Sequence, residues 1–495
     1  MGVLRSRRGV ASGGPTERRS TPPVDDPGER LGLFTALLGL AVLFHQQQLD
    51  DWAVPSVGLL VTAAAIWSIL RPTSLARLVT LMGLHLTSVL IDLPSVVNHW
   101  LMLGIAEMGI LIAVAIGLVR RSPWVTSSGL FYNRVAPTLR IQLLIVYVAA
   151  SFAKFNTDFL DPAVSCGVAM VDQLMTFGPL RLSGDWLHRP AIVGALAVEC
   201  MLAVGLAWRR TRNAALFLGL GFHLTLAFAG HVPFSGFAIA FYSLFAPDDL
   251  LLRSRTLLAR WRPLNAGISA MCRVGSGPVG LVAAFSMLAA LTLLLQAEPA
   301  RSLVRQAFVA SFLVYNIIII VWLMLVTRVT GAPVYRPGAL RLSSGIWLIG
   351  PVLIVLNAIS PYAGLKTQST FTMYSNLQTE GRHWNHLLLS EEVQVFDVQD
   401  HLVRIVHSSD PAMAEAAREG RAWVWTALQG WARRNPSASL TYEDESGVHS
   451  VPRVGADARL RSDRIEAMLA QFRDVPSGAG NYCRTERRNA GDQHS

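Results

Sequence analysis

Lysine is almost absent from this sequence of 495 residues. Of its 43 Lys and Arg residues, only Lys154 and Lys366 are lysines, so guanidinium groups carry nearly all of the basic charge. Charge of either sign is scarce as well, because 15% of the residues are charged, against roughly 25% in an average soluble domain. The charges lie in short clusters between long apolar runs. This pattern excludes an ordinary soluble domain and indicates runs that cross a lipid bilayer.

Several other signatures are missing. The four cysteines and the histidines show no zinc-like spacing, so no metal site is predicted. There is no dinucleotide or phosphate-loop motif and no internal repeat. The net charge of +10 does not indicate a nucleic-acid partner, because the arginines fall in short loops that flank apolar segments.

The apolar runs predict about eleven membrane spans, since a helix needs ~20 residues to cross the hydrocarbon core. The fold class is therefore an all-α multi-pass membrane bundle. The predicted spans cover residues 31–48, 53–70, 75–93, 100–119, 139–155, 190–208, 213–230, 233–247, 277–297, 306–326 and 344–360. The span at 233–247 starts with Pro233, Ser235 and Gly236, which indicates a re-entrant or broken helix.

The distribution of arginine predicts the orientation. With the N-terminus in the cytoplasm, the inner segments hold 23 Arg and the outer loops hold four. This asymmetry follows the positive-inside rule and predicts a cell-membrane protein whose C-terminal region is extracytoplasmic. Cys166 and Cys483 both fall on that outer side, where they either form a disulfide or stay unpaired.

The chain divides into five predicted parts. Residues 1–30 are rich in Arg, Ser, Gly and Pro and predict a disordered cytoplasmic tail. Transmembrane regions at 31–260 and 277–360 follow, then a small α+β extramembrane domain at 361–475 and a disordered tail at 476–495. In the small domain we expect strands at 393–398, helices at 411–433 and 461–473, and a hairpin at 438–453.

Lys154 is the strongest candidate for chemistry. An amine can lose its proton in an apolar site, whereas a guanidinium effectively cannot. Tyr147, Ser151 and Lys154 follow the spacing i, i+4, i+7, which forms a polar stripe on one face of an apolar helix. Such a lysine acts as a general base or extends toward the lipid headgroups. Lys366, just past the last predicted span, is expected to be an exposed lysine after a helix stop.

Further ionisable residues lie inside the predicted spans. Glu199 and His223 lie near the middle of two spans, His85 and Asp92 share one face of a third, and Glu107 lies in a fourth. Ionisable groups are costly in lipid and usually face a cavity or a partner. We therefore expect a shared polar cavity, although a single buried histidine is more often a packed hydrogen-bonding group.

Three groups of residues resemble the HTTM domain, the transmembrane domain of the vitamin K-dependent gamma-carboxylases and their bacterial relatives. The first is a helix signature and the others are a glutamate before a basic loop and a set of three short motifs. They comprise Arg140–Ile141–Gln142–Leu143 with Tyr147, Lys154, Asp158 and Leu160; Glu199 with Arg209, Arg210 and Arg212; and Gly221–Phe222–His223–Leu224, Pro233–Phe234–Ser235 and Leu244–Phe245–Ala246–Pro247–Asp248. The resemblance covers residues 30–260, and residues 360–377 also resemble bacterial proteins related to this group.

The resemblance implies an enzyme that uses a reduced quinone of the vitamin K type. In the carboxylases, the lysine that matches Lys154 deprotonates the quinone, and oxygen then adds to give a strong base. That base removes a proton from a glutamate side chain of a protein substrate, and carbon dioxide traps the carbanion. By this resemblance Lys154, His223 and Glu199 are predicted catalytic residues, Tyr147 and Ser151 bind the quinone, and an extracytoplasmic protein or peptide is the acceptor.

The sequence also departs from the family pattern. The carboxylases often show two adjacent lysines, whereas Ala153 precedes Lys154 here. Their extramembrane part is much larger than the residues that follow the last predicted span. The alternative to an enzyme is a non-catalytic membrane scaffold, an assembly factor or a transporter-like module.

Overall fold

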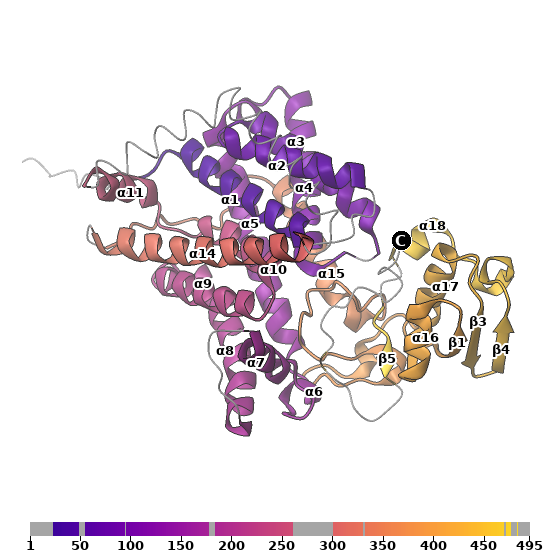
Figure 1. The fold of residues 1–495 in the computed structure, drawn as a ribbon. Coiled ribbons are helices and arrows are strands. Elements are labelled where there is room, and N and C mark those ends of the chain that lie inside the picture. Colours follow the sequence, from indigo (N-terminus) through magenta and orange to yellow (C-terminus); the bar gives the residue numbers. More distant parts are fainter. Residues whose placement is uncertain are drawn as a thin grey trace, which may run out of the picture.

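The computed structural model describes residues 23–48, 55–94, 96–177, 184–260, 300–329, 332–469, 472–476 and 483. Within these ranges the chain forms a helical bundle followed by a smaller domain built on a sheet (Figure 1). The predictions for residues 1–22, for the span at 277–297 and for residues 484–495 lie outside the described residues.

The bundle is made of helices of 10 to 30 residues, with the short α6 between α5 and α7. Its helices are α1 (Pro27–Gln48), α2 (Pro55–Leu70), α3 (Leu75–Asp92), α4 (Asn98–Val119), α5 (Ser128–Ala153), α6 (Thr157–Leu160), α7 (Cys166–Phe177), α8 (His188–Ala207), α9 (Arg212–Phe228), α10 (Val232–Ser243), α11 (Leu250–Ala259), α14 (Ala300–Val329) and α15 (Ile349–Ala363). Every predicted span within the described residues coincides with one of these helices.

Seven helices in the described part of the chain are long and apolar enough to cross a membrane. Two shorter apolar helices, within α2 and α10, add to them. The chain is therefore a helical protein with several membrane-length segments, and the total of about eleven spans stays a prediction. α1 begins at Pro27, ahead of the predicted boundary at residue 31.

Local sequence explains where the helices at the site begin and end. The Ser127 hydroxyl accepts a hydrogen bond from the amide of Leu130 at 3.4 Å and caps the start of α5. α10 starts with Pro233 in its first turn, where a missing N–H costs nothing. It runs as one helix to Ser243, so the break expected there is absent. α15 ends at Ala363, and the next residue, Gly364, has a φ of 82° that reverses the chain toward the small domain.

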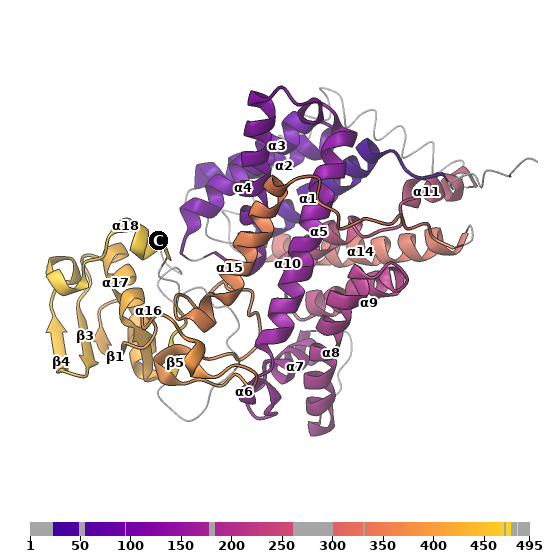
Figure 2. The same cartoon turned by 180° about the vertical axis from the view of Figure 1, so that it is seen from behind.

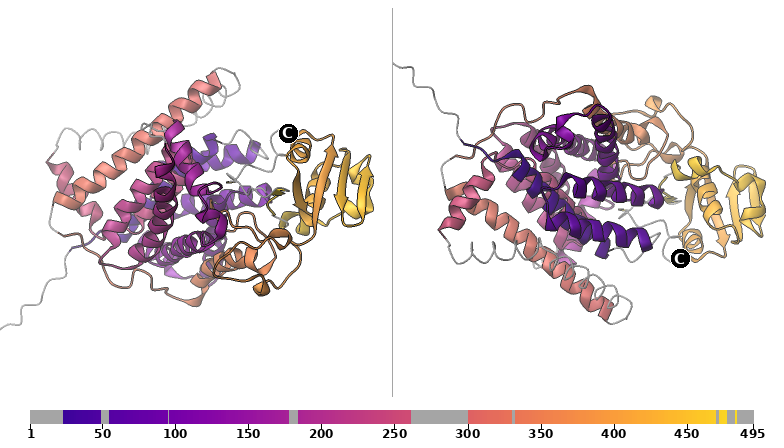
Figure 3. Two further views of the ribbon diagram at one scale, coloured as in Figure 1. Left: turned by 90° about the horizontal axis from the view of Figure 1, so that it is seen from below. Right: turned by 90° about the horizontal axis from the view of Figure 1, so that it is seen from above.

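The long helices share one core. α1 packs along α10 and α2, and α5 packs against α1, α8 and α15 (Figures 2 and 3). Phe34 of α1 and Phe241 of α10 meet edge to face with ring centroids 6.1 Å apart. α11 and the small domain lie at opposite ends of the bundle (Figure 1). The chain just past α5 meets the segment that leads to the small domain, because the amide of Leu387 donates to the carbonyl oxygen of Phe155 at 2.8 Å.

The small domain contains a five-stranded antiparallel sheet with strand order β4-β3-β1-β2-β5. The strands are β1 (Leu402–Ser408), β2 (Arg421–Val424), β3 (Leu440–Asp444), β4 (Gly447–Val451) and β5 (Val475–Pro476), with helices α16 (Pro411–Arg418), α17 (Trp425–Arg434) and α18 (Arg464–Leu469). The predicted hairpin is confirmed as β3 and β4. The strand predicted at 393–398 is wrong. Residues 394–397 have no regular secondary structure, the amides of Val395 and Phe396 donate to the carbonyl oxygen of Ala363, and β1 starts later. The single helix predicted at 411–433 is interrupted by β2.

Candidate functional site

Lys154 follows the last residue of α5 and is almost fully buried. Its Nζ atom lies 2.8 Å from Oε2 of Glu199 on α8, which forms an ion pair between two helices. The ammonium also donates to the carbonyl oxygens of Met373, at 3.0 Å, and Ala150, at 3.4 Å. The ring of Phe159 lies 5.7 Å from the same nitrogen. The amine therefore points into the protein and is not exposed on its surface.

Tyr147 lies two turns before Lys154 on α5, and its hydroxyl contacts a second cluster of polar side chains. Its hydroxyl is 2.9 Å from Nε2 of His223 on α9, and it also bonds the hydroxyl of Tyr242 on α10. Ser235 donates to the carbonyl oxygen of His223 at 2.7 Å, which fixes the backbone behind the imidazole. Three helices thus place their polar side chains against one face of α5.

A cavity of about 270 Å³ connects these groups. Most of its lining is apolar, and its polar lining includes His99, Tyr147, Lys154, Glu199, His223 and Tyr374. The wall formed by α7, α8 and α9 contains half-buried apolar side chains such as Met170 and Phe222. Its volume is just below the range of roughly 300–1,000 Å³ typical of small-molecule pockets.

The structure brings together four of the five predicted site residues. Lys154, Glu199, His223 and Tyr147 all line the cavity. Ser151 shares the face of α5 with Tyr147 and Lys154, but its hydroxyl donates to the carbonyl oxygen of Tyr147 and it is absent from the lining. The polar stripe is therefore real, and two of its three members face the cavity.

The segment after α15 closes the cavity, a role that the helix pattern did not predict. Phe371, Met373 and Tyr374 line it, and the Phe371 amide donates to the side-chain oxygen of Asn98 at 2.6 Å. Four of the five non-glycine residues with positive φ in the described ranges lie here, namely Ser369, Phe371, Tyr374 and Asn376. A left-handed backbone is unfavourable for an aromatic residue, and such strain tends to gather at functional sites.

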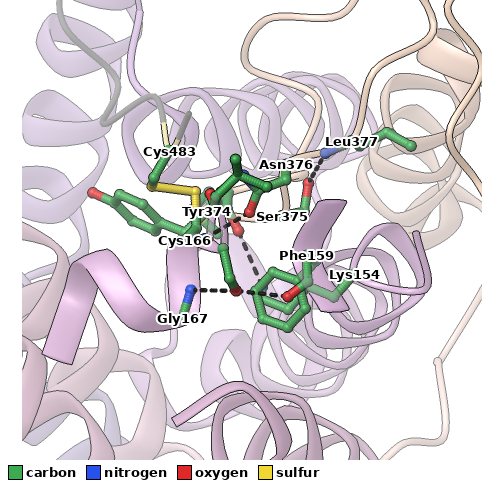
Figure 4. Close-up of a disulfide and its surroundings, with 12 residues drawn as sticks. Lys154, Phe159, Cys166, Gly167, Tyr374, Ser375, Asn376, Leu377 and Cys483 are labelled. Atoms are coloured by element: carbon green, nitrogen blue, oxygen red, sulfur yellow. Dashed lines mark hydrogen bonds between the residues drawn. A yellow bond between two sulfur atoms is a disulfide. The ribbon is translucent and has the colours of Figure 1, made fainter. Parts of the chain in front are cut away.

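A disulfide joins Cys166 to Cys483 at this edge of the cavity (Figure 4). Cys166 is the first residue of α7 and lines the cavity, and its amide donates to the side-chain oxygen of Asn376 at 2.7 Å. Tyr374 packs beside the disulfide, with Lys154 nearby. Of the two alternatives that the sequence left open, the structure contains the bonded one.

His85 and Glu107 form a separate buried pair between α3 and α4. His85 meets the ring of Trp100 edge-on, and His45 of α1 stacks on Trp100. His45 in turn bonds His99 at 3.2 Å, and His99 faces the cavity. Of the polar residues inside the predicted spans, Lys154, Glu199 and His223 line the cavity, whereas His85 and Glu107 do not. Asn98 and His99 line the cavity but were not predicted as site residues. Their signal in the sequence was a pair of adjacent polar residues at the edge of a predicted span.

The motifs that carry the HTTM resemblance contact one another. Arg140 donates to the carbonyl oxygen of Leu244 at 2.7 Å and to that of Ala339 at 2.9 Å. Arg30 donates to the carbonyl oxygen of Pro247. The motif at Leu244–Asp248 therefore supplies backbone acceptors to buried arginines, which is a structural role. Among the described residues, no group of three or more His, Cys, Asp or Glu side chains is placed to hold a metal ion.

Comparison with known proteins adds no assignment. No family model matches the chain, and no curated protein or solved structure matches it.

Proposed function

We propose that this protein is a membrane enzyme of the HTTM type that acts on a lipid-soluble reduced quinone, with Lys154 as the base. The observation that carries the proposal is the Lys154–Glu199 ion pair, with 2.8 Å between Nζ and Oε2, at the edge of a largely apolar cavity. Ionisable groups inside an apolar bundle usually face a cavity or a partner, and an apolar cavity with a few converging polar groups is the usual form of a binding site. A buried ammonium needs a charge partner in any role, so the adjacent cavity is the feature that favours chemistry over a purely structural pair.

The residues around the cavity have separate roles in the proposed reaction. Glu199 holds the Lys154 side chain beside the cavity through their ion pair, and its carboxylate is the group placed to take up the lysine proton during the reaction. The carbonyl oxygens of Met373 and Ala150 hold Nζ in place. Tyr147 and His223 form the polar end of the neighbouring wall, and they orient an oxygen atom of the substrate by hydrogen bonding.

A reduced quinone fits the lining. It supplies an acidic hydroxyl and the electrons that reduce oxygen, and its apolar body suits the cavity walls. The half-buried side chains of α7 and α9 include Met170 and Phe222, so a lipid-soluble substrate meets apolar surface on its way in. Carboxylation of a peptide glutamate on the extracytoplasmic side is the further step that the resemblance suggests.

Quinone epoxidation tests the proposal. Purified protein in lipid receives reduced naphthoquinones and oxygen, and the epoxide is measured by chromatography. We expect epoxide from the wild type and from Lys366→Arg, which changes the other lysine outside the cavity, and none from Lys154→Arg. Absence of epoxide with every quinone, from protein shown to be folded, contradicts the proposal and favours a non-catalytic scaffold, assembly factor or transporter-like module.

A further inference from the structure

Five large apolar side chains are exposed beside the ends of α5 and α15. They are Leu365, Leu387, Leu388, Val395 and Phe396, and their exposed fractions lie between 43 and 75%. We call this set the apolar lip. Exposed apolar side chains are common singly, but a contiguous patch indicates an interaction surface.

Backbone hydrogen bonds fix the apolar lip to the two helices. The amides of Val395 and Phe396 donate to the carbonyl oxygen of Ala363, the last residue of α15, at 3.3 and 3.0 Å. The amide of Leu387 donates to the carbonyl oxygen of Phe155, just past α5, at 2.8 Å. The side chains of Phe152 and Tyr362 meet edge to face at 5.6 Å, so the two helix ends are neighbours.

The apolar lip continues an apolar face of α15. Val352, Val355, Leu356 and Ile359 are exposed at the spacing i, i+3, i+4, i+7, and therefore lie on one side of this membrane-length helix. In a membrane-length helix such a face contacts lipid. Ala363 lies one turn beyond Ile359, so Val395 and Phe396 extend this lipid-facing surface beyond the helix end.

The charges around the apolar lip bear on how it would bind a membrane. Residues 383–403 contain no Lys or Arg, Glu391, Glu392 and Asp397 are exposed beside the lip, and Lys366 follows Leu365. One lysine beside three acids adds little attraction to anionic headgroups, so binding has to come mainly from burial of apolar area. Acids at the rim remain in water while the apolar side chains enter the boundary between headgroups and acyl chains.

We propose that the apolar lip inserts into the leaflet on the side of the small domain and anchors the segment that closes the cavity. The apolar lip is also tied directly to α5. His386, next to Leu387, donates from Nε2 to the carbonyl oxygen of Phe152 at 3.0 Å. Met373, whose carbonyl oxygen accepts the Lys154 ammonium, lies in the same segment before it. Lipid contact at the apolar lip thus holds in place the segment that contacts Lys154. This role does not depend on which reaction takes place in the cavity.

Spin labels measure the depth of the apolar lip in the bilayer. The full-length protein, with Cys200→Ser and Cys272→Ser and with the disulfide intact, receives Leu388→Cys or Phe396→Cys and a maleimide nitroxide in phospholipid nanodiscs. Val448→Cys is the matched control, because Val448 is 63% exposed on β4 of the same domain. Power-saturation spectra then compare collisions with oxygen, which partitions into lipid, and with a water-soluble nickel chelate.

We expect labels at positions 388 and 396 to lose collisions with the nickel chelate and to gain collisions with oxygen, relative to position 448. Labels at 388 and 396 that meet the nickel chelate as often as the label at 448 overturn the proposal and leave a protein partner as the occupant of the apolar lip. An intact disulfide on a non-reducing gel shows that each labelled variant has folded, and two lip positions guard against a local effect of one label.

Discussion

Lys154 and Glu199 meet through a contact of 2.8 Å between Nζ and Oε2, although Lys154 follows the end of α5 and Glu199 lies within α8. The Lys154 side chain is 3% exposed and that of Glu199 is 12% exposed, so neither charge is well hydrated. Each group is the main compensation for the other in a largely apolar wall. The pair is therefore a feature on which both the stability of the bundle and the chemistry of the cavity depend.

Glu199→Ala is expected to destabilise the protein whether or not it is an enzyme. Removing one partner of a buried pair leaves an uncompensated charge, which costs about 3–5 kcal/mol. Thermal unfolding of purified protein, followed by tryptophan fluorescence, measures the loss. Glu29→Gln is the control, because Glu29 pairs with Arg255 through side chains that are 39% and 60% exposed, and such surface pairs contribute about 0–1 kcal/mol. Equal melting temperatures for both variants contradict this prediction.

Tyr147→Phe is expected to cost about 1–3 kcal/mol, because buried polar groups lose a partner. Nε2 of His223 and the hydroxyl of Tyr242 each lose their hydrogen bond to the Tyr147 hydroxyl. Tyr315→Phe on α14 is a matched control, since the Tyr315 hydroxyl is buried and bonds no other group in the described residues. We expect its removal to be neutral or stabilising. Chemical denaturation of both variants in the same detergent measures their free energies of unfolding. The prediction is contradicted if Tyr147→Phe loses no more unfolding free energy than Tyr315→Phe.

The sequence predicted the bundle and most of the cavity because both depend on local patterns. A long apolar run forms a helix wherever it lies in the bundle. The spacing of Tyr147 and Lys154 fixes their shared face of α5 without any tertiary information. Glu199 and His223 stood out because ionisable residues are rare in such runs.

The closing segment and the sheet were harder to predict because long-range contacts determine them. Phe371 and Tyr374 lie in an irregular segment without periodicity, and its left-handed backbone is held by Asn98 and by the amide of Cys166. In the small domain, the alternation at 393–398 resembles a strand, but two of these amides bond to Ala363 at the end of α15. Tertiary pairing overrides β-propensity in this way.

Lys366 is expected to titrate well below an ordinary lysine. The exposed position expected for it after the helix stop is wrong, because Lys366 is half-buried beyond the end of α15. Burial lowers its pKa to about 8. Because the folded pKa is depressed below the unfolded value of about 10.4, the unfolded chain binds more protons between these pH values. Stability therefore rises as pH increases from about 8 to about 10.4, and Lys366→Met raises stability at neutral pH by up to roughly 3 kcal/mol.

Competitive acetylation measures this pKa directly, because the chain has only two lysines. Labelling of the Lys366 peptide, read by mass spectrometry across a pH series, is expected to reach half its maximum near pH 8. The same peptide from urea-unfolded protein is the reference and should titrate near the ordinary value of about 10.4. Coincident titrations of the folded and unfolded forms contradict the prediction.

The Cys166–Cys483 disulfide is expected to stabilise the protein and to report its orientation. It closes a loop with a sequence separation of 317, and a cross-link of this kind typically contributes about 2–4 kcal/mol by restricting the unfolded chain. Cys483→Ser should lower the melting temperature and abolish its dependence on reductant, whereas Cys200→Ser should keep that dependence, because Cys200 is a free thiol. A reductant-sensitive melting temperature that persists in Cys483→Ser contradicts this assignment.

The same bond also bears on the side of the membrane that the small domain occupies. Disulfides persist in oxidising compartments and are rare in the cytosol. Cells lysed in N-ethylmaleimide should therefore yield protein that migrates faster on a non-reducing gel than on a reducing one, and this shift should vanish in Cys166→Ser and Cys483→Ser. Protein trapped with both cysteines alkylated would instead place this end of the bundle in the cytoplasm, and would reverse the orientation that the arginine distribution predicts.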